Sequence, residues 1–162
     1  MTPVPVIIAI DPATHGLGVA CASLGYGHIV HAGYVPLVQD GFLEERVRQA
    51  CENANTDLFE PVDIVIERVG GGRGVQSMLK VADVAGITAG VMSVFWPDAT
   101  IWRPTPGEWK KGAGFKGNAK KPEVHERALE LWGEDIDRQD TADAICMAWA
   151  RWSELAGLVD LE

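Results

Sequence analysis

Cysteine is scarce in this sequence of 162 residues, and the way it is used excludes two classes of small protein. Cys21, Cys51 and Cys146 are odd in number and show no CxxC spacing. A disulfide framework needs paired cysteines, and a structural zinc site needs closely spaced cysteines or histidines. We therefore expect neither of them, and the cysteine usage is typical of a protein from a reducing cytoplasm.

Long hydrophobic runs are also lacking. No apolar run approaches the roughly 20 residues that a membrane-spanning helix needs, and the N-terminal MTPVPVIIAI has no basic region of the kind that begins a signal peptide. A chain of 162 residues that is 47% hydrophobic is long enough for one buried core and too short for two domains of ordinary size. We predict one domain over residues 1–162, soluble and cytoplasmic, with no membrane partner.

Positive charge is scarce, because 14 Lys and Arg residues stand against 23 Asp and Glu residues, for a net charge of −9. This balance does not favour nucleic-acid binding through overall electrostatics. Half of the cations nevertheless lie in residues 103–127, here called the basic segment, where seven cations against three acids give 7 − 3 = +4. These cations are Arg103, Lys110, Lys111, Lys116, Lys120, Lys121 and Arg127. The segment is either a phosphate-binding surface or a solvated lysine-rich loop.

Two strongly apolar strands are present, and each of them ends in an acid. Residues 6–10 form a β-branched run that ends at Asp11, where Pro12 removes a backbone donor and stops the strand. Residues 61–67 repeat the pattern and end at Glu67. Ligands of open α/β sheets bind at the carboxyl ends of strands, so these acids are candidates for metal or phosphate chemistry. The structural alternative for Asp11 is a turn in which it hydrogen-bonds its own backbone.

The order of elements predicts an α/β fold with a five-stranded mixed sheet flanked by helices. Glycines 16 and 18 predict a hairpin into a second strand over residues 17–23, and alternation over 28–35 predicts a third, so the first three strands are antiparallel. A fifth strand is expected at 100–104. Helical periodicity appears over residues 41–57, 75–93, about 122–132 and 137–152, and residues 112–121 are expected to form a mobile loop.

Two helices carry features beyond their periodicity. Ala82, Gly86 and Gly90 lie four apart on one helix face, which allows another helix to approach closely, either within the monomer or across a dimer seam. Asp140 and Asp143 are three apart at the start of the last helix, so their side chains point to the same face. Asp140 could be the helix cap. Capping explains Asp143 less well, because it lies next to the apolar stripe.

The two strand-ending acids and the acid pair can converge on one point if the strands are neighbours. Like carboxylates that are held together repel one another unless cations lie between them. Oxygen ligands without histidine or cysteine suit Mg²⁺ or Mn²⁺ better than zinc, and two such ions about 4 Å apart are the usual device for hydrolysing a phosphodiester.

In this order and spacing, four blocks resemble those of the RuvC family of Holliday junction resolvases, which have the RNase H-like fold. The blocks are IIAIDP with Asp11, DIVIE with Glu67, KPEVH with Lys121, and DTADA with Asp140 and Asp143, and together they span nearly the whole chain. The resemblance implies an endodeoxyribonuclease that cleaves branched DNA, with Holliday junctions, flaps and forks as candidate substrates, to leave 5′-phosphate and 3′-hydroxyl ends.

The resemblance also implies roles for individual residues. It makes Asp11, Glu67, Asp140 and Asp143 the ligands of two Mg²⁺ or Mn²⁺ ions and places Lys121 at the cleaved phosphate. We assign DNA contacts to Arg73, Lys110, Lys111, Lys116 and Lys120. A homodimer is expected, because resolution of a junction needs two symmetric cuts.

One segment departs from the family pattern. Residues 70–72 are glycines where family members commonly carry an aromatic residue that inserts at the junction, so we predict recognition of branch shape with weak sequence preference. Phe115 or Trp109 could replace that aromatic wedge. The glycine run lacks the Lys-Ser/Thr of a phosphate loop, so it receives no nucleotide role.

Two other functions remain open. An actin-like ATP-dependent phosphotransferase shares the fold type, but it needs a second domain to close over ATP. A non-catalytic module that binds branched DNA would use the same acids only structurally.

Overall fold

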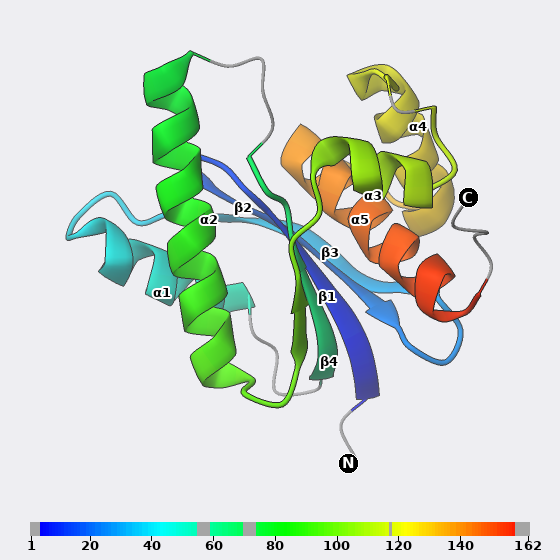
Figure 1. Ribbon diagram of the computed structural model, residues 1–162, viewed down its shortest axis with the longest axis horizontal. Helices are drawn as coiled ribbons and strands as arrows, with labels where there is room; N and C mark the ends of the chain where they lie inside the picture. Colours follow the sequence, from blue (N-terminus) through cyan, green and yellow to red (C-terminus); the bar gives the residue numbers. More distant parts are fainter. Residues whose placement is uncertain (1–3, 55–58, 70–73, 117, 158–162) are drawn as a thin grey trace.

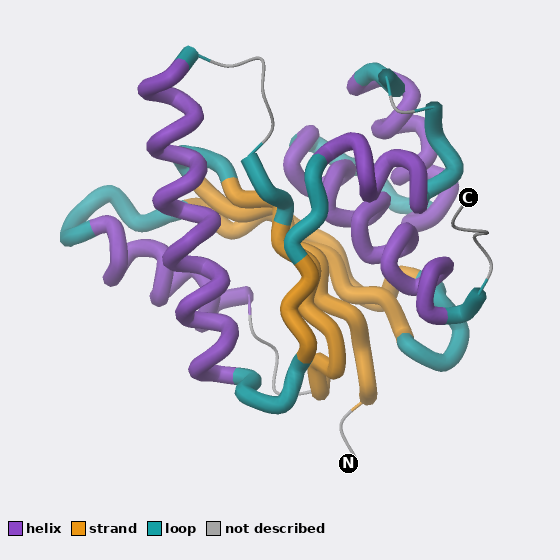
Figure 2. The backbone as a smooth tube through the Cα atoms, in the orientation of Figure 1, coloured by secondary structure: helices purple, strands orange, loops and turns teal. Residues whose placement is uncertain are grey.

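The computed structural model describes residues 4–54, 59–69, 74–116 and 118–157, and it places one sheet between two layers of helices (Figures 1 and 2). The strands are β1 (Val4–Pro12), β2 (Gly16–Ser23), β3 (Ile29–Pro36), β4 (Phe59–Ile66) and β5 (Thr100–Trp102). The helices are α1 (Leu43–Ala54), α2 (Val75–Phe95), α3 (Pro106–Gly112), α4 (Lys121–Trp132) and α5 (Gln139–Leu155). Figure 1 shows α1 and α2 on one face of the sheet and α3, α4 and α5 on the other.

The sheet is mixed, which confirms the predicted fold class. Its strand order is β3-β2-β1-β4-β5, with β1, β2 and β3 antiparallel, and with β4 and β5 parallel to β1. Because β1 and β4 are parallel neighbours, their carboxyl ends lie at the same edge of the sheet. The Glu67 backbone N–H donates to the Ile10 carbonyl at 3.3 Å, so the two acid-terminated strands end side by side.

Strand β1 is buried on both faces, which explains its continuous apolar run. Ile7 and Ala9 pack into a core with α3, α4 and α5. Ile8 and Ile10 pack into a second core with α1 and α2. The two cores hold the end of β1, and therefore Asp11, in a fixed position.

A buried ion pair fixes α5 to the sheet. Arg151 donates from Nε to Asp63 Oδ1 at 3.0 Å and from Nη2 to Asp63 Oδ2 at 2.9 Å. The two side chains are 13% and 6% exposed, and such two-pronged pairs are geometrically specific. The pair anchors the C-terminal half of α5 to the sheet. It thereby helps to fix the orientation of the whole helix, including its first turn, which holds Asp140.

All three cysteines are buried and free. Burial raises the pKa of each thiol to about 12, so the thiols stay protonated at neutral pH. They serve as small core residues, in agreement with the expectation of no disulfide framework.

Helix α3 is the main element that the sequence analysis missed. Its N-cap is Thr105, whose hydroxyl accepts from the Glu108 backbone N–H at 3.4 Å, while the Glu108 carboxylate accepts from the Thr105 backbone N–H at 2.6 Å. Pro106 follows at the first helical position. The signal for a helix start is therefore present in the letters TPGE, within a stretch whose most prominent feature is its charge.

Helix α2 exposes the small residues that the sequence analysis placed on one face. Ala82, Gly86 and Gly90 are exposed, and a Cβ added at either glycine would meet no atom within 4 Å. The opposite side of the helix is buried through Val81, Val84, Ala85, Thr88 and Met92. Packing within the monomer therefore does not explain the small residues, and the alternative of a dimer seam stays a prediction.

Helix α2 also corrects the statement on hydrophobic runs. It is 21 residues long and contains an 18-residue window with a mean hydropathy of 1.5, and among the described helices it alone is long and apolar enough to cross a membrane by length and composition. The run is not obvious in the sequence because Lys80 and Asp83 interrupt it without lowering the average much. In this fold α2 covers one face of the sheet beside α1 (Figure 1), with 28% of its apolar window buried.

Candidate active site

A pocket of about 300 Å³ lies where β1 and β4 end, and we call it the carboxylate pocket. It brings together two of the predicted acids, Glu67 and Asp143, with two of the predicted lysines, Lys110 and Lys121. Its remaining walls are Pro12, Val69, Val81, Pro106, Trp109 and Val124. Residues that are far apart in the sequence thus meet at one edge of the sheet, as the strand arrangement predicts.

Glu67 is held by a tryptophan that the sequence analysis considered only as a wedge. The Trp109 Nε1–H donates to Glu67 Oε2 at 2.5 Å, and Trp109 is 1% exposed. A buried indole N–H requires a partner, and here the partner is a strand-ending carboxylate. Trp109 is therefore wrong as a base-unstacking wedge, because it lies inside the core. Phe115 is also partly packed against that core.

Asp143 is partly buried and faces the same pocket. Gln139 donates from Nε2 to Asp143 Oδ1 at 2.8 Å. Burial raises the pKa of Asp143 above the ordinary value, and the nearby negative charge of Asp140 adds to this increase. The Gln139 hydrogen bond and the charges of Lys110 and Lys121 act in the opposite direction. The electrostatic neighbours of Asp143 are thus the residues that were predicted to share its site.

Gly18 is a shared neighbour of Asp11 and Asp140. Asp11 is 7% exposed and pairs across the hairpin with Gly18. A Cβ at Gly18 would lie 2.1 Å from the Asp140 carbonyl oxygen, so a side chain cannot fit there. The first turn of α5 therefore rests on the backbone of β2 directly beside Asp11. Asp140 lies in that first turn and is not the cap, which is Arg138.

The predicted DNA-contacting cations divide into three groups. Lys110 lines the carboxylate pocket and donates from Nζ to the Ala119 carbonyl at 2.9 Å, which ties α3 to the approach of α4. Lys111, Lys116 and Lys120 are exposed and do not line this pocket. Arg73 and the glycines at 70–72 lie outside the described residues.

The donor chemistry of the pocket fits a hard divalent cation. Glu67 and Asp143 offer carboxylate oxygens, and no Cys or His side chain lines the pocket among the described residues. Burial of Asp143 near Asp140 creates a repulsion that a cation would relieve. In the part of the chain that the structure describes, however, no three His, Cys, Asp or Glu side chains lie close enough together to hold a metal ion. Convergence of all four acids on metal therefore stays a prediction.

Comparison with known proteins places the chain near one group of enzymes. A scan against models of protein families finds no match. The chain is 29% identical over 167 residues to the crossover junction endodeoxyribonuclease RuvC of Chlamydia trachomatis serovar L2, an alignment that covers 96% of this chain and 95% of the relative. It is 26% identical over 148 residues to the RuvC of Xanthomonas euvesicatoria, covering 88% and 84%.

Solved structures agree with these relatives. The RuvC of Thermus thermophilus matches with a TM-score of 0.73 at 21% identity, over 94% of this chain and 96% of the other. The yeast mitochondrial Holliday junction resolvase matches with a TM-score of 0.63 at 13% identity, over 96% and 82%. The chain thus has the RNase H-like fold and is similar to RuvC along most of its length, which confirms the family resemblance that its four acidic and basic motifs indicate.

Proposed function

We propose that this protein is a metal-dependent endonuclease that cleaves branched DNA. The observation that carries the proposal is the meeting of Glu67, Asp143, Lys110 and Lys121 in one pocket at the ends of β1 and β4. Relatives named crossover junction endodeoxyribonuclease support it, as does the match to T. thermophilus RuvC in complex with a Holliday junction substrate, at a TM-score of 0.69.

The mechanism divides the pocket into an acidic and a basic part. Asp11, Glu67, Asp140 and Asp143 would hold Mg²⁺ or Mn²⁺, two ions in our proposal. When bound, such ions activate water and stabilise the leaving oxygen, which yields 5′-phosphate and 3′-hydroxyl ends. Trp109 and Gln139 orient the carboxylates of Glu67 and Asp143.

The basic part acts on the substrate. Lys121 and Lys110 line the same pocket as the two acids. Their positive charges would offset the negative charge that builds on the phosphate in the transition state, where fixed charges are most effective. Exposed Lys111, Lys116 and Lys120 would guide the strand toward the pocket. Arg73 keeps its proposed DNA contact, although it lies outside the described residues.

We also propose that the protein acts as a homodimer, with cytoplasm as its compartment. The exposed face of α2 carries the large apolar residues Val75, Leu79 and Val94, which are 70%, 59% and 76% exposed, beside the small residues Ala82, Gly86 and Gly90. A two-fold pairing of this face would cover it and present two pockets to the two strands of a junction.

One experiment separates the candidate functions. Labelled four-way junction, flap, fork and duplex DNA are incubated with the protein and Mg²⁺ or Mn²⁺, in parallel with the Asp11→Asn and Asp143→Asn variants. We expect cleavage of branched DNA by the wild type only, with junction binding retained by both variants. Binding that is unaffected by metal and without cleavage would favour the non-catalytic module. ATP hydrolysis without DNA cleavage would favour the phosphotransferase.

A further inference from the structure

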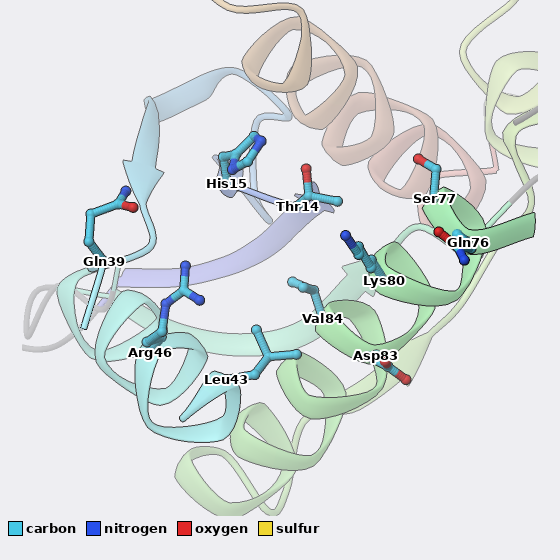
Figure 3. Close-up of a pocket in the computed structure, with 10 residues that line it drawn as sticks. All are labelled: Thr14, His15, Gln39, Leu43, Arg46, Gln76, Ser77, Lys80, Asp83 and Val84. Carbon is cyan, nitrogen blue, oxygen red and sulfur yellow. The ribbon is translucent and has the colours of Figure 1, made fainter. Parts of the chain in front are cut away.

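A second and larger pocket lies on the other face of the sheet, outside the carboxylate pocket. Its volume is about 740 Å³, and we call it the polar pocket. It is formed by the β1–β2 turn, the segment before α1, α1 itself and the first half of α2 (Figure 3). Its walls are Thr14, His15, Gln39, Leu43, Arg46, Gln76, Ser77, Lys80, Asp83 and Val84.

Two cations face this pocket. Arg46 and Lys80 form no ion pair with any residue that the structure describes, and both point into the hollow in Figure 3. Arg46 also donates from Nε to the Val38 carbonyl, which fixes the direction of its guanidinium. The only carboxylate among the described lining residues belongs to Asp83, and Figure 3 shows it pointing away. Although the protein is acidic overall, the positive charges of Arg46 and Lys80 in this open pocket favour the binding of an anion.

Arg48, the neighbouring arginine on the same helix, differs from Arg46 in its partners. Arg48 contacts Glu45 and Glu52 on the exposed side of α1, so its charge is already neutralised. Arg46 is two residues away and faces the pocket instead. The described side chains that accompany it supply hydroxyl, amide and imidazole groups, and they include no Phe, Tyr or Trp ring to stack on a base. The chemistry therefore fits a phosphate better than a nucleobase.

The polar pocket is adjacent to the carboxylate pocket. Pro12 lines the carboxylate pocket and Thr14 lines the polar pocket, so the same short turn forms a wall of both. On α2, Val81 lines the first pocket while Lys80 and Val84 line the second. A polyanion that occupies the carboxylate pocket can thus continue between the β1–β2 turn and α2 into the polar pocket.

We propose that the polar pocket binds a backbone phosphate of the DNA strand that passes through the carboxylate pocket, with Arg46 and Lys80 as its charged contacts. This proposal rests on the proposed nuclease function. It assigns a phosphate subsite on the α1–α2 side of the sheet, opposite the basic segment. The strand would then be held on both sides of the cleaved bond.

The test compares junction binding by wild type, the double variant Arg46→Ala/Lys80→Ala and the control Arg48→Ala, each as a function of salt. Removing one phosphate contact should reduce the log–log salt slope by roughly 0.9, so we expect a decrease of about 0.9 for the double variant and none for the control. At saturating DNA and metal, the control Arg48→Ala should cleave at the wild-type rate. Thermal melting verifies that all three proteins are folded.

Three outcomes would overturn the subsite. The first is a double variant with wild-type affinity and slope, while the wild type binds and cleaves junctions. The second is an equal decrease in Arg48→Ala. The third is binding of inorganic phosphate or a mononucleotide that the double variant no longer shows while its DNA affinity is unchanged, which would assign the pocket to a free phosphate compound. A wild type that neither binds nor cleaves branched DNA would instead contradict the proposed function itself.

Discussion

At the scale of single residues, the proposed metal ligands depend on side chains that orient them, and Trp109 is the clearest example. Its indole N–H contacts Glu67, and Trp109→Phe removes this donor while keeping an aromatic ring in the core. Loss of such an outer partner typically costs 10–100-fold in metal affinity or activity. We expect a decrease of this size in Mn²⁺ affinity by titration and in the cleavage rate.

The control for this variant is Trp152→Phe. Trp152 also donates its indole N–H, to the Leu24 carbonyl at 3.0 Å, but Trp152 does not line the carboxylate pocket. This variant should melt at a lower temperature without a change in Mn²⁺ affinity. Equal effects of the two substitutions on Mn²⁺ affinity would show that Trp109 acts only through packing.

Asp143 gives a prediction on stability and pH. Its pKa is raised in the folded protein mainly by burial, so the ionised form destabilises the fold at pH values above that raised pKa. This penalty decreases as the pH falls from the folded pKa toward the lower unfolded pKa, and it is absent below the unfolded pKa, because the carboxyl is then protonated in both states. In the absence of metal, Asp143→Asn should therefore melt at a higher temperature than wild type at pH 7, and the difference should shrink in acid. A difference that grows toward low pH would contradict the raised pKa.

The residue scale is also where the sequence is least informative. Asp11, Glu67 and Asp143 could be found because each follows an apolar strand or borders an apolar stripe. Trp109 could not, because nothing in its neighbourhood indicates that a ring 42 positions from Glu67 reaches the Glu67 carboxylate. That Arg46 forms no ion pair within the described part of the chain likewise cannot be predicted from the sequence, because it depends on which side of α1 faces the sheet.

At the scale of elements, the contact between α5 and β2 sets the distance between Asp140 and Asp11. Gly18→Ala would place a Cβ 2.1 Å from the Asp140 carbonyl oxygen, and backbone has to move to relieve this clash. Overpacking of this kind costs about 1–3 kcal/mol. We expect a lower free energy of unfolding in denaturant titration and the absence of metal-dependent cleavage, because the first turn of α5 is pushed away from β1.

Gly33→Ala is the matched control for this substitution. Gly33 lies in the neighbouring strand β3, and a Cβ there would meet no atom within 4 Å. Cleavage by this variant should equal that of wild type. If Gly18→Ala were as stable and as active as Gly33→Ala, the close approach of α5 would not be needed for the site.

The elements themselves are largely predictable, since β-branched runs, alternation and helical periods indicate every described strand and four of the five described helices. Helix α3 was missed because charge dominates its sequence and its apolar contribution is essentially one residue, Trp109. Gly18 lies within the predicted second strand and pairs there in β2, but nothing in the sequence indicates that it allows a helix to contact the sheet. The sequence shows where a glycine lacks a side chain, but only the packing shows which neighbour occupies the space that is left.

At the scale of the whole molecule, the exposed face of α2 predicts the oligomeric state. Gly86→Leu adds a bulky side chain where no atom lies within 4 Å, so the monomer should tolerate it, and replacing a helix-interior glycine should even favour the helix by up to about 1 kcal/mol. A dimer that pairs α2 with its copy should not tolerate it. We expect light scattering to show a dimer for wild type and a monomer for Gly86→Leu. An unchanged hydrodynamic size, or a monomeric wild type at micromolar concentration, would exclude this seam.

The distribution of charge over the molecule predicts how DNA binding responds to salt. The net charge is −9, yet every lysine except Lys80 lies between residues 110 and 121, and two of these, Lys110 and Lys121, line the carboxylate pocket. Like charge on the rest of the surface repels DNA, so binding depends on local contacts that release counterions. Changing Lys116, Lys120 and Lys121 to Ala should reduce the log–log salt slope by roughly 0.9 for each of these lysines that binds a phosphate.

The variant that lacks these three lysines also tests the two proposed DNA surfaces against each other. The polar pocket is lined by α1 and α2, which cover the face of the sheet opposite α3 and α4 (Figure 1). Its contribution should therefore persist in the triple variant, and adding Arg46→Ala/Lys80→Ala should lower the slope further by a nearly additive amount. Fluorescence anisotropy with a labelled junction at several salt concentrations measures both steps. A triple variant with the wild-type slope would remove the basic segment from the DNA-binding surface and leave the phosphate contacts to the α1–α2 side.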